Sequence, residues 1–68
     1  MQIKNFKGII IYEDNNVTMK ATLETAVKAD AELVCACFYN ANLCNADLRG
    51  ACLANVNLTG AKLRGVKL

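Results

Sequence analysis

A five-residue repeat runs through the second half of the chain. From Ala31 onward, every first position of the repeat is a small apolar residue and every third position is a large one. The third positions are Leu33, Phe38, Leu43, Leu48, Leu53, Leu58, Leu63 and Leu68. Leu23 falls on the same phase, so all eight leucines of the chain occupy one position of the repeat. Regularity of this kind identifies an internal repeat, and its period limits the folds that are possible.

A period of five fits neither a regular α-helix nor a flat strand. On an α-helix, successive leucines would rotate by about 140° and spread around every face. On a flat strand they would point to alternate faces, because side chains alternate and five is odd. A backbone that turns a corner once per repeat is compatible with a period of five, since positions one and three of each short side then both point inward. Turn-forming residues support such corners: Asn42, Asp47 and Asn57 at the second position, and Gly50, Gly60 and Gly65 at the fifth.

The segments ANLCN (residues 41–45) and ADLRG (residues 46–50) resemble the repeat of the pentapeptide-repeat proteins. The resemblance covers residues 31–68. It implies a mainly β fold, a right-handed quadrilateral β-helix in which four repeats complete one coil. Residues 31–68 would then form about two coils.

Residues 1–30 lie outside the repeat, and we expect them to cap its N-terminal end within one domain. Strands are expected near residues 3–6 and 9–13, on either side of a turn at Lys7-Gly8. Apolar residues at helical spacing predict a helix over residues 19–29. Small pentapeptide-repeat proteins often carry such a strand–helix cap, which the resemblance therefore also implies.

The boundary between cap and repeat is set by Lys28. If the repeat began earlier, this lysine would point into the bore, where an unpaired charge is very costly. Thr18 is the expected N-cap of the helix. The glycine expected at the end of the helix is missing near Ala29, so the sequence does not show how the helix passes into the repeat.

Little in the sequence indicates catalysis. Histidine is absent, which removes the commonest general base and zinc ligand. No phosphate-binding glycine loop is present. Cys35, Cys37, Cys44 and Cys52 all occupy outward positions around the tube, so they should neither converge on one metal ion nor form disulfides. We therefore expect no enzyme activity, metal or cofactor.

Three outward-facing regions are candidate functional surfaces. A near-neutral surface, which could equally be ordinary surface scatter, comprises Val34, Cys35, Cys37, Tyr39, Cys52 and Ala54. A basic patch, either a solvated face or an anion-binding site, comprises Arg49, Lys62, Arg64 and Lys67. The third region is the C-terminal coil, whose candidate dimer residues are Leu63, Val66 and Leu68. It could pair with a second copy. Otherwise it frays, or the chain is cut from a longer one.

The sequence thus favours a non-catalytic protein–protein interaction module that forms a homodimer through its C-terminal coil. Its partner would be an unidentified protein, and it would inhibit or modulate a host or cellular macromolecular complex. The alternative is a structural element that oligomerises through the open coil. Some longer pentapeptide-repeat proteins act on DNA gyrase as acidic duplex mimics, but this chain is short and basic at its C-terminal end.

The remaining expectations concern location and other partners. A net charge of +2 is too small to indicate nucleic-acid binding. The longest apolar run, residues 9–12, is too short for a membrane span, and no signal peptide is apparent. We expect a cytoplasmic protein, of the short stand-alone kind found in bacterial and phage genomes.

Overall fold

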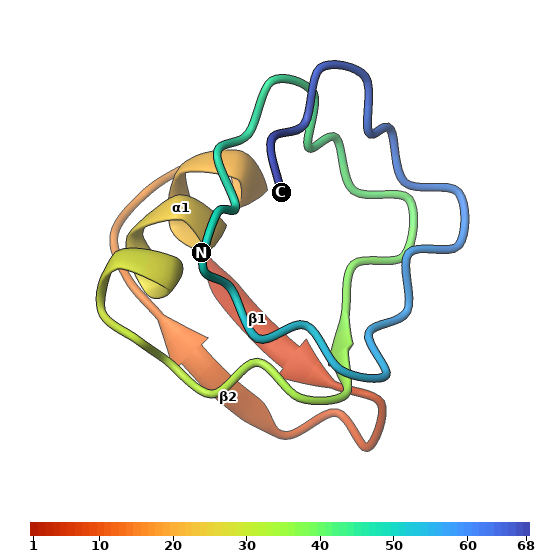
Figure 1. The fold of residues 1–68 in the computed structure, drawn as a ribbon. Coiled ribbons are helices and arrows are strands. Elements are labelled where there is room, and N and C mark those ends of the chain that lie inside the picture. Colours follow the sequence, from red (N-terminus) through yellow and green to blue (C-terminus); the bar gives the residue numbers. More distant parts are fainter.

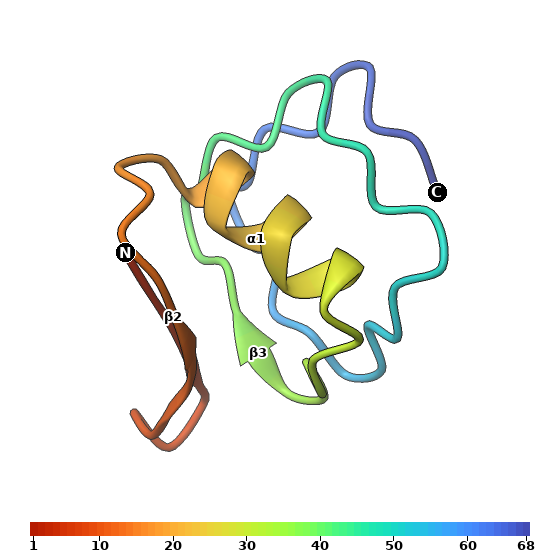
Figure 2. The same cartoon turned by 90° about the vertical axis from the view of Figure 1, so that its left-hand side faces the viewer.

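The computed structural model describes residues 1–68, which form a hairpin, a helix and a stacked repeat (Figure 1). Strand β1 spans Gln2–Asn5, β2 spans Ile10–Glu13, helix α1 spans Met19–Lys28 and β3 spans Ala36–Cys37. The strands form one sheet in the order β2-β1-β3, and both pairings are antiparallel. Figure 2 shows α1 lying across the ring of the repeat with the hairpin beside it.

The hairpin turn is organised by Asn5. Its side-chain oxygen accepts hydrogen bonds from the backbone N–H groups of Lys7 (2.9 Å) and Ile9 (3.1 Å). Its carbonyl accepts a further bond from the N–H of Gly8 at 2.9 Å. Asparagine favours this arrangement because its short amide can bond to the backbone two residues on. The turn lies where the Lys7-Gly8 pair indicated, and the strands are one residue from the expected bounds at three of their four ends.

Helix α1 has well-defined ends. Thr18 is its N-cap, and the hydroxyl of Thr18 accepts a hydrogen bond from the N–H of Ala21 at 3.2 Å. At the C-terminal end, the N–H of Asp30 donates to Val27 (3.1 Å) and that of Ala31 donates to Ala26 (3.0 Å). These are the two bonds of a Schellman motif, which requires a left-handed residue after the cap.

Asp30 supplies that left-handed residue, with φ of 55°. It stands where glycine would normally be found, and aspartate is one of the few other residues that adopt this conformation with modest cost. Asp30 also falls on the fifth position of the repeat phase. The end of the helix and the first corner of the repeat are therefore the same residue.

Asp14 links the hairpin to α1. Its Oδ1 accepts hydrogen bonds from the hydroxyl of Thr22 (2.9 Å) and the N–H of Asn16 (3.0 Å). Thr22 is fully buried, so this bond satisfies its hydroxyl. Burial opposes ionisation of Asp14, but the hydrogen bonds from Thr22 and Asn16 outweigh it and hold the pKa of this carboxyl below its usual range.

The repeat folds as two stacked layers of chain, a first layer of residues 31–50 and a second layer of residues 51–68. Parallel bridges join residues twenty apart: Cys37 with Asn57, Asn42 with Lys62, and Asp47 with Lys67. Regular strand is nevertheless limited in this region to the two residues of β3. Each side is short and is flanked by corner turns, so most of the ladder consists of isolated bridges.

Hydrogen bonds between the layers run in both directions. The N–H of Leu43 in the first layer donates to the carbonyl of Lys62 in the second at 2.9 Å. The N–H of Lys62 donates back to the carbonyl of Ala41, also at 2.9 Å. The same alternation recurs on the sides before and after, so backbone bonds hold the layers together wherever one covers the other.

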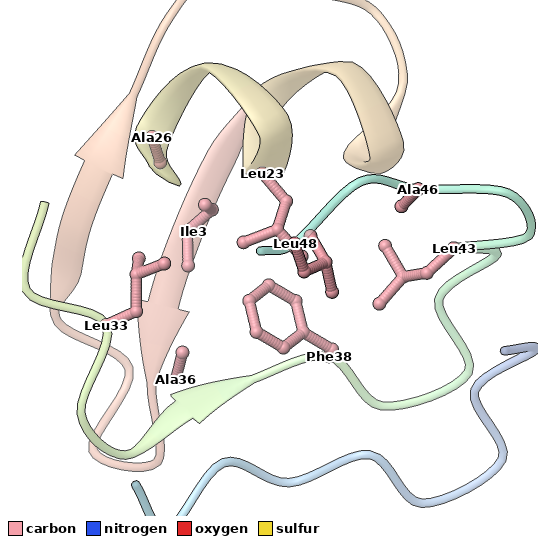
Figure 3. Packing of buried hydrophobic residues seen from close by; sticks show 9 residues of the cluster. All are labelled: Ile3, Leu23, Ala26, Leu33, Ala36, Phe38, Leu43, Ala46 and Leu48. Atoms are coloured by element: carbon pink, nitrogen blue, oxygen red, sulfur yellow. The ribbon is translucent and has the colours of Figure 1, made fainter. Parts of the chain in front are cut away.

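The core lies inside the first layer and against the cap (Figure 3). Leu23 of α1 points toward Phe38 and Leu48, while Ile3 of β1 lies beside Leu33. The buried apolar residues are Ile3, Leu23, Ala26, Leu33, Ala36, Phe38, Leu43, Ala46 and Leu48. First and third positions of the first layer therefore face inward, as the period of five predicts.

Corners occur at the fifth position of the repeat, where every residue from Asp30 to Gly65 has positive φ. The sequence pattern indicated this for the glycines, but Asn40, Asn45 and Asn55 serve equally, and Cys35 does so as well. Second-position side chains stabilise the corners by accepting hydrogen bonds from the backbone N–H two residues on. For example, the side-chain oxygen of Asn57 accepts from the N–H of Thr59 at 3.0 Å.

Corner residues of the two layers are matched in size. The side-chain oxygen of Asn40 lies where a Cβ on Gly60 would be, and Asn45 has the same relation to Gly65. Around Gly50, by contrast, a Cβ would meet nothing within 4 Å. Glycine in the second layer thus makes room for asparagine in the first.

We expect Asp30→Gly to raise the free energy of unfolding by about 0.5–1 kcal/mol, because glycine adopts the left-handed conformation without the Cβ penalty. The carboxylate of Asp30 makes no hydrogen bond or ion pair that would be lost. Urea unfolding followed by circular dichroism measures the change. Asp30→Ala is the control and should destabilise the protein, while a loss of stability in Asp30→Gly would contradict the corner assignment.

Gly60→Ala should destabilise the protein by more than Gly50→Ala does. Both residues have positive φ, 71° and 81°, so both substitutions carry the same backbone strain. Only Gly60→Ala also displaces the side chain of Asn40. Urea unfolding of each variant with and without Asn40→Ala tests this in a double-mutant cycle. Equal losses for the two glycines would show that the matched corners contribute nothing.

Candidate functional site

The C-terminal face of the second layer is hollow and apolar. A cavity of about 170 Å³ is lined by Phe38, Val66 and seven leucines, with no polar side chain among them. Among the lining residues, Leu23 of α1 is fully buried at the inner end of the cavity, whereas Leu68 is 85% exposed. The candidate dimer residues Leu63, Val66 and Leu68 all line this cavity. We call the cavity and the backbone edge around it the open face.

Exposure of the repeat's leucines rises toward the open face. Leu43 and Leu48 in the first layer are 0% and 4% exposed, but the equivalent residues twenty positions later, Leu63 and Leu68, are 41% and 85% exposed. The reason is that the first layer is covered by the cap and the second layer, whereas nothing in the structure covers the second layer. Leu53 and Leu58 are half-buried and join the lining, a role that the sequence-based selection of dimer residues missed.

The backbone edge of the open face is also unpaired. In the first layer, the N–H groups of Phe38 and Leu43 donate to the second layer. Their equivalents, the N–H groups of Leu58 and Leu63, have no acceptor in the structure, and the carbonyl of Ala61 has no donor. The edge therefore offers both donors and acceptors to an incoming strand.

The four cations of the basic patch have different surroundings. The Arg49 guanidinium binds Asp47 in a two-pronged ion pair, with Nε–Oδ1 and Nη2–Oδ2 distances of 2.9 and 2.8 Å. Lys67 is stacked on Asp47 in the ladder. Lys62 and Arg64 lie in the second layer, and residues 51–68 contain no acidic side chain. The excess positive charge therefore belongs to the second layer.

The near-neutral surface spans both layers. Val34 and Tyr39 are exposed, Cys35 and Cys37 are half-buried, and Cys52 and Ala54 are exposed. The N–H of Cys35 donates to the carbonyl of Ala54 at 2.9 Å, so these two are adjacent. Phe6 extends the surface from the hairpin, since its N–H donates to the carbonyl of Cys35 at 3.1 Å and its side chain is 68% exposed. Sequence reasoning missed Phe6 because the contact joins residues far apart in the chain.

No group of metal-ligating side chains gathers anywhere in the structure, and all four cysteines are free thiols. No helix combines the length with the apolar character needed to cross a membrane. The side chains on these surfaces can bind through apolar contact, backbone hydrogen bonds and charge.

Comparison with protein families agrees with the geometry of the stacked layers. The family model for pentapeptide repeats matches residues 29–65, more than half of the chain, with eight copies of the repeat. The chain belongs to the pentapeptide-repeat family. No match was found among curated proteins or among solved structures.

Membership confirms the family resemblance noted in the sequence and identifies the stacked layers as a β-helix-type solenoid. Pentapeptide-repeat proteins are generally non-enzymatic structural or interaction modules. Membership is consistent with a non-catalytic interaction module.

Asp47 should titrate near pH 2 in this pentapeptide-repeat protein. Hydrogen bonds from the side chain and the backbone of Arg49 hold its pKa at about 2, below the usual value of 3.8. The folded state therefore binds this proton more weakly than the unfolded state, and the ion pair's contribution is lost as the pH falls from about 4 toward 2. An NMR titration of the Asp47 carboxyl measures this pKa. Arg49→Gln should move the midpoint upward, and an unchanged midpoint would contradict the assigned pair.

Proposed function

We propose that this chain is a non-catalytic protein–protein interaction module that forms a homodimer through its open face. The observation that supports the proposal is that an apolar cavity and an unpaired backbone edge lie on the same face. An edge that offers donors and acceptors together is self-complementary. Self-complementarity is the requirement of a two-fold interface, in which each subunit presents the same surface.

The cap over the N-terminal end favours a dimer over open-ended growth. There, β1 pairs with β3, Leu23 fills the bore, and a carboxylate oxygen of Glu24 accepts the N–H of Asp47 at 2.9 Å. A head-to-tail contact would have to displace this cap, whereas a head-to-head contact uses only the open face. The alternative, a structural element that oligomerises through the open face, requires the cap to move.

The solenoid is taken to be right-handed and quadrilateral with about two coils. The twenty-residue separation of ladder partners supports four five-residue sides per coil. The protein is taken to act in the cytoplasm as a modulator of a host or cellular macromolecular complex. Its protein partner would contact the near-neutral surface or the basic patch, both of which lie on the sides of the solenoid. The acid-free second layer argues against imitation of a DNA duplex.

The small area of the open face is typical of a weak or transient dimer. The molecule measures 28 × 24 × 22 Å, so one end of it presents less than the roughly 800 Å² per partner of a standard stable interface. We therefore expect dissociation constants on the order of micromolar rather than a permanent dimer.

Sedimentation velocity across the micromolar range should show a species of 7.4 kDa that converts into one of twice that mass as concentration rises. Leu63→Glu should abolish the dimer, because it places a carboxylate on the open face. Leu63 is already 41% exposed, so the fold should survive, as circular dichroism would show. Thr59→Glu is the matched control, since it adds the same charge to an outward position of the same layer.

The outcomes are distinct. A dimer that Leu63→Glu disrupts and Thr59→Glu leaves intact supports the proposal. A monomer at every concentration contradicts it, and a series of ever larger species favours the structural element instead.

A further inference from the structure

The N-terminal rim of the first layer is covered on some sides and bare on another. Strand β1 covers Ala36–Cys37, and Glu24 of α1 accepts the N–H of Asp47 on the side formed by residues 46–50. Between them lies the side formed by residues 41–45, which no element of the cap covers. This bare side is at the opposite end of the solenoid from the open face.

Backbone groups of the bare side lack hydrogen-bond partners that the equivalent groups of residues 61–65, in the second layer, possess. In the second layer, the N–H of Lys62 donates to Ala41, and the carbonyls of Lys62 and Arg64 accept from the first layer. The corresponding N–H and carbonyl of Asn42, and the carbonyl of Cys44, make no hydrogen bond in the structure. The side therefore presents one donor and two acceptors in the pattern that a strand of the ladder normally satisfies.

A shallow, open groove follows this rim. Two adjoining pockets of about 420 and 590 Å³ share Met1 and Met19. The smaller pocket includes Asn42 and Cys44 of the bare side, and the larger continues along β1 past Cys37. We call the two pockets together the rim groove.

Charge in the rim groove has a single sign. Its lining includes Lys4 and Lys20 and no acidic side chain. Lys20 lies 3.8 Å from one oxygen of Glu24, but the other oxygen of Glu24 is bound to the N–H of Asp47, outside the groove. Met1 and Met19 add flexible apolar surface that can adapt to different side chains.

In addition to the contacts on the sides of the solenoid proposed above, we propose that the rim groove binds an extended acidic peptide segment of a protein partner, which adds a strand to residues 41–45. The unpaired groups of Asn42 and Cys44 would bond to the peptide backbone, and alternate side chains would face the methionines and the lysines. The added strand continues an interface that already exists, since β1 pairs with the same rim one side earlier through Lys4 and Cys37.

The direct test uses a fluorescein-labelled peptide of about nine residues in which valine and glutamate alternate. Fluorescence anisotropy measures its binding to the full chain, and amide hydrogen exchange by NMR reports on the backbone. Binding should slow exchange of the Asn42 amide about tenfold, because that N–H gains an acceptor. Asn42→Ala should retain this binding, since the substitution keeps the backbone donor.

Charge-reversal variants distinguish binding in the rim groove from general electrostatic attraction to the protein. Lys4→Glu should weaken binding about fivefold or more, whereas Lys28→Glu makes the same change in net charge at the far end of α1 and should leave binding nearly unchanged. Three results would overturn the proposal: no binding, unaltered exchange at Asn42 when peptide is bound, or equal weakening by the two substitutions.

Discussion

The left-handed backbone conformation at every fifth residue is the constraint on which the rest of the structure depends. Each such residue turns the chain by one corner, and only then do the first and third positions of the next side point back to the interior. Most residues avoid this conformation, which explains why asparagine, aspartate and glycine hold seven of the eight corners from Asp30 to Gly65. Cys35 is the exception, and nothing in its surroundings explains it.

The sequence was most informative about the interior. The small first-position and large third-position residues of the repeat together predicted the buried residues of the first layer, because the repeat is strict and the bore admits only apolar side chains. The cap was also predictable in outline, since Thr18 and the spacing of apolar residues mark the start of α1. Asp30 was not predicted as the turning residue, because glycine is the residue typical of that position at the end of a helix.

Contacts between distant residues were the part that the sequence did not show. Asn40 and Gly60 are both recognisable as turn residues in the sequence. Only the stacking of the layers shows that the Asn40 side chain occupies the space beside Gly60. Glu24 looks like an ordinary partner of a lysine in the helix, yet it also caps the backbone of Asp47. The rim groove and the cavity of the open face likewise depend on what the cap covers and leaves bare, which spacing alone does not determine.

The matched corners have a consequence for how such a chain can change in length. Asn40 meets Gly60 because twenty residues separate them. Insertion of a single five-residue unit between them would bring Asn55 into that place, and two amide side chains would then compete for the space that glycine leaves. Insertion of a copy of the whole second layer would keep glycine opposite Asn40. Evolution by duplication should therefore proceed in steps of complete layers, and a lone extra unit should be tolerated only beyond the last matched corner.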